Sequence, residues 1–245
     1  MKKIRMFGMA MLVVLMGVSF ISCGNQDNEK KLVRIVADES DTLYTFKYDD
    51  TGKLIESRSL AQFVLSPAIL TSELIWNDDV ILAANHFTTI DPYTQGMEFN
   101  DTTKYVLENN LIKYIGDCPL TYDESGRLVD LGNIFSFIWD SDKLVEVEFG
   151  DESEGFEYVY SKKTCRKGYN PAVLMFGLVI ILGDEEVLHI AHPELYGMMT
   201  SQLIECITGS EGILTLEYEF DREGYISKIF CTSEDITQTL TFSWE

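Results

Sequence analysis

The chain has 245 residues and carries 40 Asp and Glu against 19 Lys and Arg, which gives a net charge of −21 at pH 7. Such an acidic excess repels nucleic acid and anionic membrane surfaces, which excludes both as electrostatic partners. The length is sufficient for one large β domain or two small ones.

The first 22 residues have the pattern of a signal peptide. Lys2, Lys3 and Arg5 precede an uncharged apolar run from Met6 to Ser22, which corresponds to a positive n-region followed by a short h-region. At 17 residues the run is shorter than the roughly 20 residues that a spanning helix needs. We therefore expect export, with an uncleaved transmembrane anchor as the alternative.

The apolar run ends in Phe20-Ile21-Ser22-Cys23-Gly24, where a small residue precedes a cysteine. This segment resembles the lipobox of bacterial lipoproteins, which implies that Cys23 becomes the mature N-terminus and carries acyl chains. Stable anchoring requires more than one membrane-binding signal, and several acyl chains meet that requirement. The mature part would retain 16 Lys and Arg against 40 Asp and Glu, a net charge of −24.

The stretch from Tyr44 to Leu60, YTFKYDDTGKLIESRSL, has the pattern of a β-hairpin. Tyr44, Phe46 and Tyr48 alternate with polar residues, as expected for a strand with one buried face. The segment Asp49–Gly52 fits a type I turn followed by a glycine that forms a bulge. The same turn recurs at Asp123–Gly126 and Asp221–Gly224.

Three shorter variants are centred on Asp78-Asp79, Asn109-Asn110 and Asp140-Ser141-Asp142. The first two predict two-residue type I′ loops, in which both central residues take positive φ. In all six copies a large ring or leucine precedes the turn and an aliphatic residue follows it, which predicts cross-strand pairs. The expected pairs are Tyr48–Leu54, Trp76–Val80, Leu107–Leu111, Tyr122–Leu128, Trp139–Leu144 and Phe220–Ile226.

The repeat is interrupted between Tyr169 and Gly209. Asn170-Pro171 predicts the start of a helix, and a strand is expected near Leu203 to Ile207. The whole chain predicts an all-β fold, an antiparallel meander of roughly 14 strands, with a short helical or irregular insertion near 170–209. The meander would form a closed or half-open barrel over 32–245 as a single domain, after a signal peptide over 1–22 and a tether over 23–31.

A family resemblance rests on these motifs together. The lipobox, the Tyr-Asp-x-x-Gly-x-Leu hairpins, the apolar insertion and the closing hairpin from Glu217 to Ile229 resemble the uncharacterised Bacteroidetes lipoproteins with a porin-like β-barrel fold. The resemblance covers most of the mature chain and implies the fold rather than an activity. The turns at Asn77–Asp79 and Asn109-Asn110 lack the usual glycine, which leaves the strand register there open.

Residues with catalytic or ligating chemistry are few. His189-x-x-His192 is followed by Pro193, which disfavours helical geometry at His192, and it has no third ligand at a diagnostic spacing. We expect an ordinary loop there and a surface or edge position for His86. The acidic segments 151–154 and 184–186 do not match the ligand spacing of an EF-hand and predict solvated turns. No metal or cofactor is expected.

Four cysteines remain beside Cys23, namely Cys118, Cys165, Cys206 and Cys231. An even number in an exported protein permits disulfides, but buried free thiols are equally compatible with these spacings. Sequence motifs for a nucleophilic serine and for a phosphate-binding loop are absent. The sequence therefore favours a protein that is not an enzyme.

Three aromatic residues are the candidate ligand contacts: Trp76, Trp139 and Tyr169. Facing solvent they would form a stacking platform, and facing inward they would belong to the core. The favoured hypothesis is a non-enzymatic outer-membrane lipoprotein, on the periplasmic face or the cell surface, that binds a glycan, a lipid or an envelope protein. The alternatives are a structural or partner-binding component of an outer-membrane complex, and a hydrolase that uses a carboxylate pair about 5 to 10 Å apart.

Overall fold

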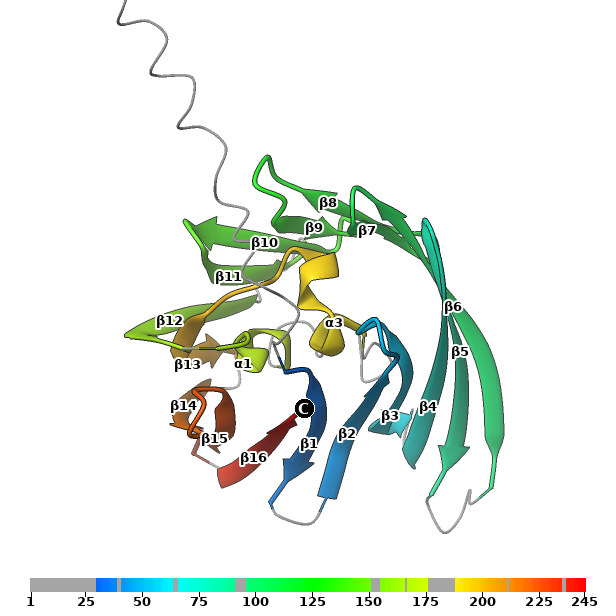
Figure 1. Cartoon of the computed structure of the whole chain (residues 1–245). Helices are drawn as coiled ribbons and strands as arrows, with labels where there is room; N and C mark the ends of the chain where they lie inside the picture. Colours follow the sequence, from blue (N-terminus) through cyan, green and yellow to red (C-terminus); the bar gives the residue numbers. More distant parts are fainter. Residues whose placement is uncertain are drawn as a thin grey trace, which may run out of the picture.

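The computed structural model describes residues 30–38, 41–63, 66–90, 96–150, 155–165, 167–175, 188–210, 212–234 and 237–245. Within these residues, 16 strands form one closed barrel in which each strand pairs antiparallel with its neighbours in sequence and β16 pairs with β1 (Figure 1). The predicted all-β barrel is confirmed, with 16 strands where roughly 14 were expected. No helix of the described residues is long and apolar enough to cross a membrane.

The strands are β1 (Leu32–Ala37), β2 (Asp41–Tyr48), β3 (Leu54–Phe63), β4 (Ser66–Asn77), β5 (Val80–Thr89), β6 (Glu98–Glu108), β7 (Leu111–Ile115), β8 (Cys118–Tyr122), β9 (Leu128–Leu131), β10 (Phe135–Asp140), β11 (Lys143–Phe149), β12 (Gly155–Thr164), β13 (Gln202–Gly209), β14 (Gly212–Phe220), β15 (Ile226–Thr232) and β16 (Thr237–Trp244). Between β12 and β13 lie α1 (Pro171–Val173), α3 (Leu188–Ala191) and the 3₁₀ helix η3 (Pro193–Tyr196).

The Asp-x-x-Gly turns have the predicted geometry. Asp49 Oδ1 accepts hydrogen bonds from the backbone N–H groups of Thr51 and Lys53, at 2.8 and 3.0 Å, and Gly52 has φ +82°. The register of β2 against β3 shifts at Tyr48, as a glycine bulge requires. The turns at Asp123 and Asp221 repeat both the side-chain hydrogen bonds and the positive-φ glycine.

The cross-strand pairs were predicted correctly where a glycine bulge is present or the loop is longer. Confirmed are Tyr48–Leu54, Tyr122–Leu128, Trp139–Leu144 and Phe220–Ile226. Two pairs were wrong by one residue, because Trp76 lies opposite Ile81 and Leu107 lies opposite Ile112. A two-residue loop adds no bulged residue, so the residues that flank it pair directly.

The two shortest loops differ in backbone conformation. Asn109 and Asn110 have φ +55° and +63°, which confirms the type I′ prediction. Asp78 and Asp79 do not have positive φ, so the same prediction was wrong for their loop. A type I′ turn needs positive φ at both central residues, and aspartate is favoured only at the first of them.

The interior of the barrel is the hydrophobic core. Figure 1 shows α1 and α3 lying inside the ring of strands. We call the described residues 169–175 and 188–200 the plug. Its apolar side chains are buried together with the inward-facing residues of the strands; they are Ala172, Leu174, Met175, Leu188, Ile190, Ala191, Leu195, Tyr196 and Met198.

The predicted insertion is confirmed for the plug. The Asn170 side chain accepts a hydrogen bond from the Ala172 N–H at 3.1 Å and so caps α1, as expected from Asn170-Pro171. The strand expected near Leu203 is β13. Most of the apolar run that follows Pro171 lies outside the described residues.

Candidate functional site

Two of the predicted ligand-contact residues, Trp76 and Trp139, are half-buried at the same end of the barrel. The Trp76 indole N–H donates to the Leu54 carbonyl, and the Trp139 indole N–H donates to the Leu128 carbonyl, both at 2.7 Å. Lys53 Nζ lies 5.4 Å from the Trp76 ring centroid, within range of a cation–π contact. The polar edge of each indole is therefore occupied by the protein's own backbone.

The same arrangement recurs around the barrel. A ring towards the end of an even-numbered strand donates to a backbone carbonyl at the start of the preceding strand, at 2.6–2.9 Å. The donor and acceptor pairs are Tyr48–Leu32, Trp76–Leu54, Tyr122–Ile112, Trp139–Leu128, Tyr160–Leu144 and Trp244–Ile226. We call these rings the aromatic rim.

Basic side chains cover part of the aromatic rim. The preceding strand, or the turn that leads into it, places a cation over the next ring, with centroid distances of 5.2–5.9 Å. These contacts are Lys53 on Trp76, Lys113 on Tyr122, Arg127 on Trp139 and Lys143 on Tyr160. In these four hairpins the Lys or Arg beside the aliphatic residue thus has a structural role.

Tyr169 lies where the plug meets the aromatic rim. Its hydroxyl donates to the Ile190 carbonyl, and its ring packs edge-to-face against Trp244 with centroids 5.6 Å apart. These contacts hold the two described segments of the plug together. Ligand contact by Trp76, Trp139 or Tyr169 stays a prediction. A ligand would have to bind the part of each ring that its hydrogen bond and ring contacts within the protein do not cover.

The buried His192 joins the plug to the barrel wall. Its Nε2 accepts a hydrogen bond from the Leu54 backbone N–H at 3.1 Å, so Nδ1 carries the proton and donates to Glu194 Oε1 at 2.7 Å. The order of carboxylate and imidazole resembles a hydrolytic triad. The third position, however, holds the Leu54 backbone N–H instead of a nucleophile, so these hydrogen bonds fasten the plug to β3.

Glu194 contributes to stability through the same hydrogen bond. Burial acts to raise the pKa of Glu194, but the hydrogen bond from His192, together with a backbone hydrogen bond and the charge of Lys31, lowers the pKa overall. A carboxyl group with a lowered pKa stabilises the fold above its unfolded pKa of about 4.3, and this stabilisation is lost as the pH falls further. The attachment of the plug should therefore weaken in acid.

Replacing His192 with phenylalanine should lower the free energy of unfolding by about 2 to 3 kcal/mol, because the Leu54 N–H would be left buried without an acceptor. His192→Gln offers a carbonyl oxygen to the same N–H and should recover part of the loss. Urea unfolding of both variants measures the difference. Equal stability of the two variants would contradict the proposed role of the Nε2 acceptor.

His189 lies in α3, where an ordinary loop was expected; the helix ends at Ala191, before the residue that Pro193 restricts. Among the described residues, no group of three or more His, Cys, Asp or Glu side chains is placed to hold a metal ion. His86 lies on the outward face of β5, with Nδ1 2.7 Å from Asn100 Oδ1. His189 is fully buried and packs edge-to-face on Tyr196. The acidic segments 151–154 and 184–186 lie outside the described residues.

In the described part of the chain, none of the four cysteines of the barrel forms a disulfide. Burial, together with the nearby Asp38 carboxylate, raises the pKa of Cys231 to about 12. Burial also raises the pKa of Cys118, with a smaller contribution from Asp130. The thiolate is the reactive form of cysteine, so neither residue has the environment of a nucleophile.

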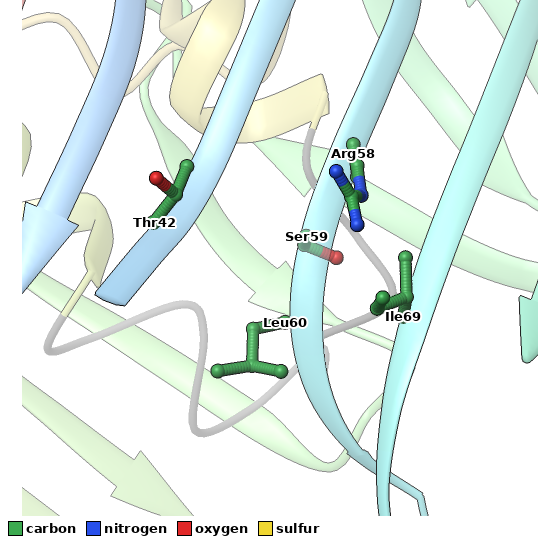
Figure 2. Close-up of a pocket in the computed structure, with 5 residues that line it drawn as sticks. All are labelled: Thr42, Arg58, Ser59, Leu60 and Ile69. Atoms are coloured by element: carbon green, nitrogen blue, oxygen red, sulfur yellow. The ribbon is translucent and has the colours of Figure 1, made fainter. Parts of the chain in front are cut away.

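A small cavity opens where β2 and β3 separate. It has a volume of about 130 Å³ and is lined by Thr42, Arg58, Ser59, Leu60 and Ile69. Figure 2 shows Thr42 on β2, with Arg58, Ser59 and Leu60 on β3 and Ile69 on β4. We call this opening the seam. The seam was not predictable from the sequence, because nothing in an alternating strand pattern marks where two neighbouring strands stop pairing.

Acidic residues of neighbouring strands also meet on the outside of the barrel. Glu146 of β11 lies directly opposite Glu157 of β12, a placement that brings Cβ atoms to about 5 Å. A glycosidase needs its two carboxyl groups to flank a bound sugar. This pair lies on the outer face, and the seam has no carboxylate among its lining residues.

No protein-family model matches this chain, and no curated protein matches it at a significant level. Among solved structures, a porin-like protein from Bacteroides uniformis ATCC 8492 is similar over 89% of this chain and 96% of its own, with 13% identity and a TM-score of 0.47. A porin-like protein from Bacteroides vulgatus ATCC 8482 is similar over 87% and 98%, with 12% identity and a TM-score of 0.36. At these identities and TM-scores, neither likeness indicates an activity, a ligand or a location.

Proposed function

We propose that this protein is a non-enzymatic, lipid-anchored barrel of the outer membrane that binds its ligand at the outer wall. The observation that carries the proposal is the packing of the interior. Most inward-facing apolar residues of the strands form one core with the plug, while Leu70 and Phe87 form a second, smaller cluster. Residues of both strands and plug, such as Ile190 and Ile229, are fully buried. Because its own side chains fill the interior of the barrel, a ligand would bind on the outer face.

The outer wall consists of the strand residues that alternate with the buried ones. A barrel that crosses a membrane presents an outward apolar band about 25 Å tall. Here charged residues are exposed on the outer wall of many strands, which supports a barrel that stands in water beside its anchor. They include Lys47, Glu56, Arg58, Glu73, Lys104, Glu148, Glu157, Glu217 and Glu219.

The predicted anchor would orient the barrel. β1 begins at Leu32, whose carbonyl accepts a hydrogen bond from Tyr48 of the aromatic rim. The tether over 23–31 spans at most about 30 Å when extended. The aromatic rim would therefore face the membrane. Thr42 lies at the opposite end of β2, so the seam would face away from the bilayer, where a ligand in solution can reach it.

Lipid anchoring is tested by replacing Cys23 with serine in the full-length chain. We expect the wild-type protein in the membrane fraction and Cys23→Ser in the soluble fraction, because a single-residue change removes all acyl chains. Cys118→Ser serves as the matched control and should remain with the membrane. If Cys23→Ser stays membrane-bound, the uncleaved transmembrane anchor is the better explanation.

Ligand binding is tested by native mass spectrometry of the protein purified from its own envelope. A bound small molecule of reproducible mass supports the proposal. A defined protein partner without a small ligand would instead favour the structural component of an outer-membrane complex. Recovery of the bare chain alone, under conditions that preserve a known complex purified in parallel, would contradict binding.

A further inference from the structure

The seam lies where the β2–β3 ladder ends before its two strands do. β2 pairs with β3 only as far as Tyr44 opposite Ser59, although β2 continues to Asp41 against β1 and β3 continues to Phe63 against β4. Within the described residues, no register pair joins the remaining ends of β2 and β3. The seam therefore lies beside two strand ends that, in the described part of the chain, form no ladder with each other.

A basic pair flanks the seam on the outer wall. Arg34, Thr45 and Arg58 are successive register partners across β1, β2 and β3, which places the two arginine backbones about 10 Å apart. Arg34 Nη2 donates to Thr42 Oγ1 at 2.7 Å. The Thr42 hydroxyl thus uses a lone pair for Arg34 and keeps its own proton for a further acceptor.

Arg58 is exposed and has no polar partner among the described residues. Its nearest acid along the same face, Glu56, is engaged by Lys47 at 3.3 Å. Its register partners are the uncharged Thr45 and Thr71. On a chain with 40 acidic residues, an arginine that lines a cavity and pairs with no acid in the described part of the chain is a candidate for binding an external anion.

We infer that the seam binds an oxyanion, a carboxylate or a phosphate, that is attached to a short aliphatic group. A guanidinium binds both oxyanions through two parallel hydrogen bonds, and the Thr42 hydroxyl supplies a third donor from the other strand. Leu60 and Ile69 complete the lining with aliphatic surface. A volume of about 130 Å³ is below the roughly 300 Å³ of sites that enclose a whole ligand, so the seam takes a terminal group.

This inference rests on the proposal that the protein binds at its outer wall, and it names the chemistry of that site. The test is calorimetric titration of the full-length protein with butyrate and with propyl phosphate at constant ionic strength. Butyramide, which has nearly the same shape as butyrate without the charge, is the control ligand. We expect saturable binding of at least one anion and no binding of butyramide. The anion that binds more tightly shows whether the seam prefers a carboxylate or a phosphate.

Variants assign the binding to the seam. Arg58→Gln should weaken anion binding about tenfold to a hundredfold, as expected for the loss of a charged hydrogen-bonding partner, and Thr42→Val should weaken it less. Arg222→Gln removes the same charge from an exposed turn at the other end of the barrel and should bind like wild type. Absence of saturable binding, or an equal loss in Arg58→Gln and Arg222→Gln, would overturn the inference.

The outcome for the seam can be separated from the outcome for the proposed function. If Arg58→Gln, purified from its own envelope, still carries the ligand seen with wild type, then the outer-wall proposal stands and the seam assignment is wrong. If wild type carries no ligand yet binds butyrate or propyl phosphate through Arg58, the seam assignment stands by itself.

Discussion

Replacing Gly197 with alanine is expected to lower the free energy of unfolding by about 3 kcal/mol or more. Gly197 follows η3 with φ +61°, a conformation that costs a residue with a Cβ roughly 1 to 2 kcal/mol. A Cβ at this position would also lie only 2.1 Å from the Gly126 carbonyl oxygen. The oxygen is a backbone atom and the Cβ is attached directly to the backbone, so neither can rotate away. The clash can be relieved only if the plug moves away from the turn between β8 and β9.

Gly116→Ala is the matched control for this prediction. Gly116 has φ +58°, but no atom lies within 4 Å of the position that its Cβ would take. It should therefore show the conformational cost without the clash. Urea unfolding of the two variants separates these contributions, and near-ultraviolet circular dichroism reports on the packing of the plug. Similar stabilities for the two variants would mean that the plug does not pack tightly against Gly126.

The second prediction concerns alkaline pH and the tyrosines of the aromatic rim. Burial raises the pKa of Tyr48, Tyr122 and Tyr160, and each hydroxyl donates its proton to a backbone carbonyl. A group whose pKa is raised by folding stabilises the fold fully below its unfolded pKa and loses this contribution as the pH rises. Above about pH 10, stability should fall by about 1.4 kcal/mol per pH unit for each tyrosine, or about 4 kcal/mol for the three together.

Urea unfolding between about pH 8 and pH 11 measures this slope. Substituting the three tyrosines with phenylalanine should lower stability at neutral pH, because carbonyl groups lose their donors. It should also reduce the alkaline slope by about 4 kcal/mol per pH unit, and a slope should remain because burial also raises the pKa of Tyr158, Tyr169 and Tyr218. Tyr114→Phe is the control, since Tyr114 is 47% exposed on β7 and its removal should leave the slope unchanged. An alkaline slope as steep in the triple variant as in wild type would contradict the role assigned to the aromatic rim.

The local structure of the hairpins was predictable because it depends on residues that are neighbours in sequence. Asp49, Gly52 and their equivalents determine the turn through contacts that reach no further than four residues. The two register errors, at Trp76 and Leu107, occurred where no glycine marks a bulge. There the sequence leaves two registers open, and only the pairing of the complete strands selects one.

Features that involve a third strand were not predictable in the same way. The indole of Trp76 has its register partner on β5, yet its N–H donates to Leu54 on β3, and this contact needs the order of strands in the closed barrel. The burial of His192 depends on the plug meeting β3, which is 138 residues away in sequence. The seam likewise depends on where β2 and β3 diverge, so Arg58 resembles any outward-facing charge in the sequence.

The closure of the barrel at β1 has a mechanical consequence. β1 is hydrogen-bonded to β2 on one side and to β16 on the other, and the backbone groups of Lys31 and Glu245 bond to each other at the same end. A pulling force that enters the chain before Lys31 acts along the axis of β1. It would strain both ladders in shear, with all their bonds sharing the force, instead of peeling them apart one bond at a time. A barrel held by such a strand can resist tension from its tether without a separate reinforcing domain.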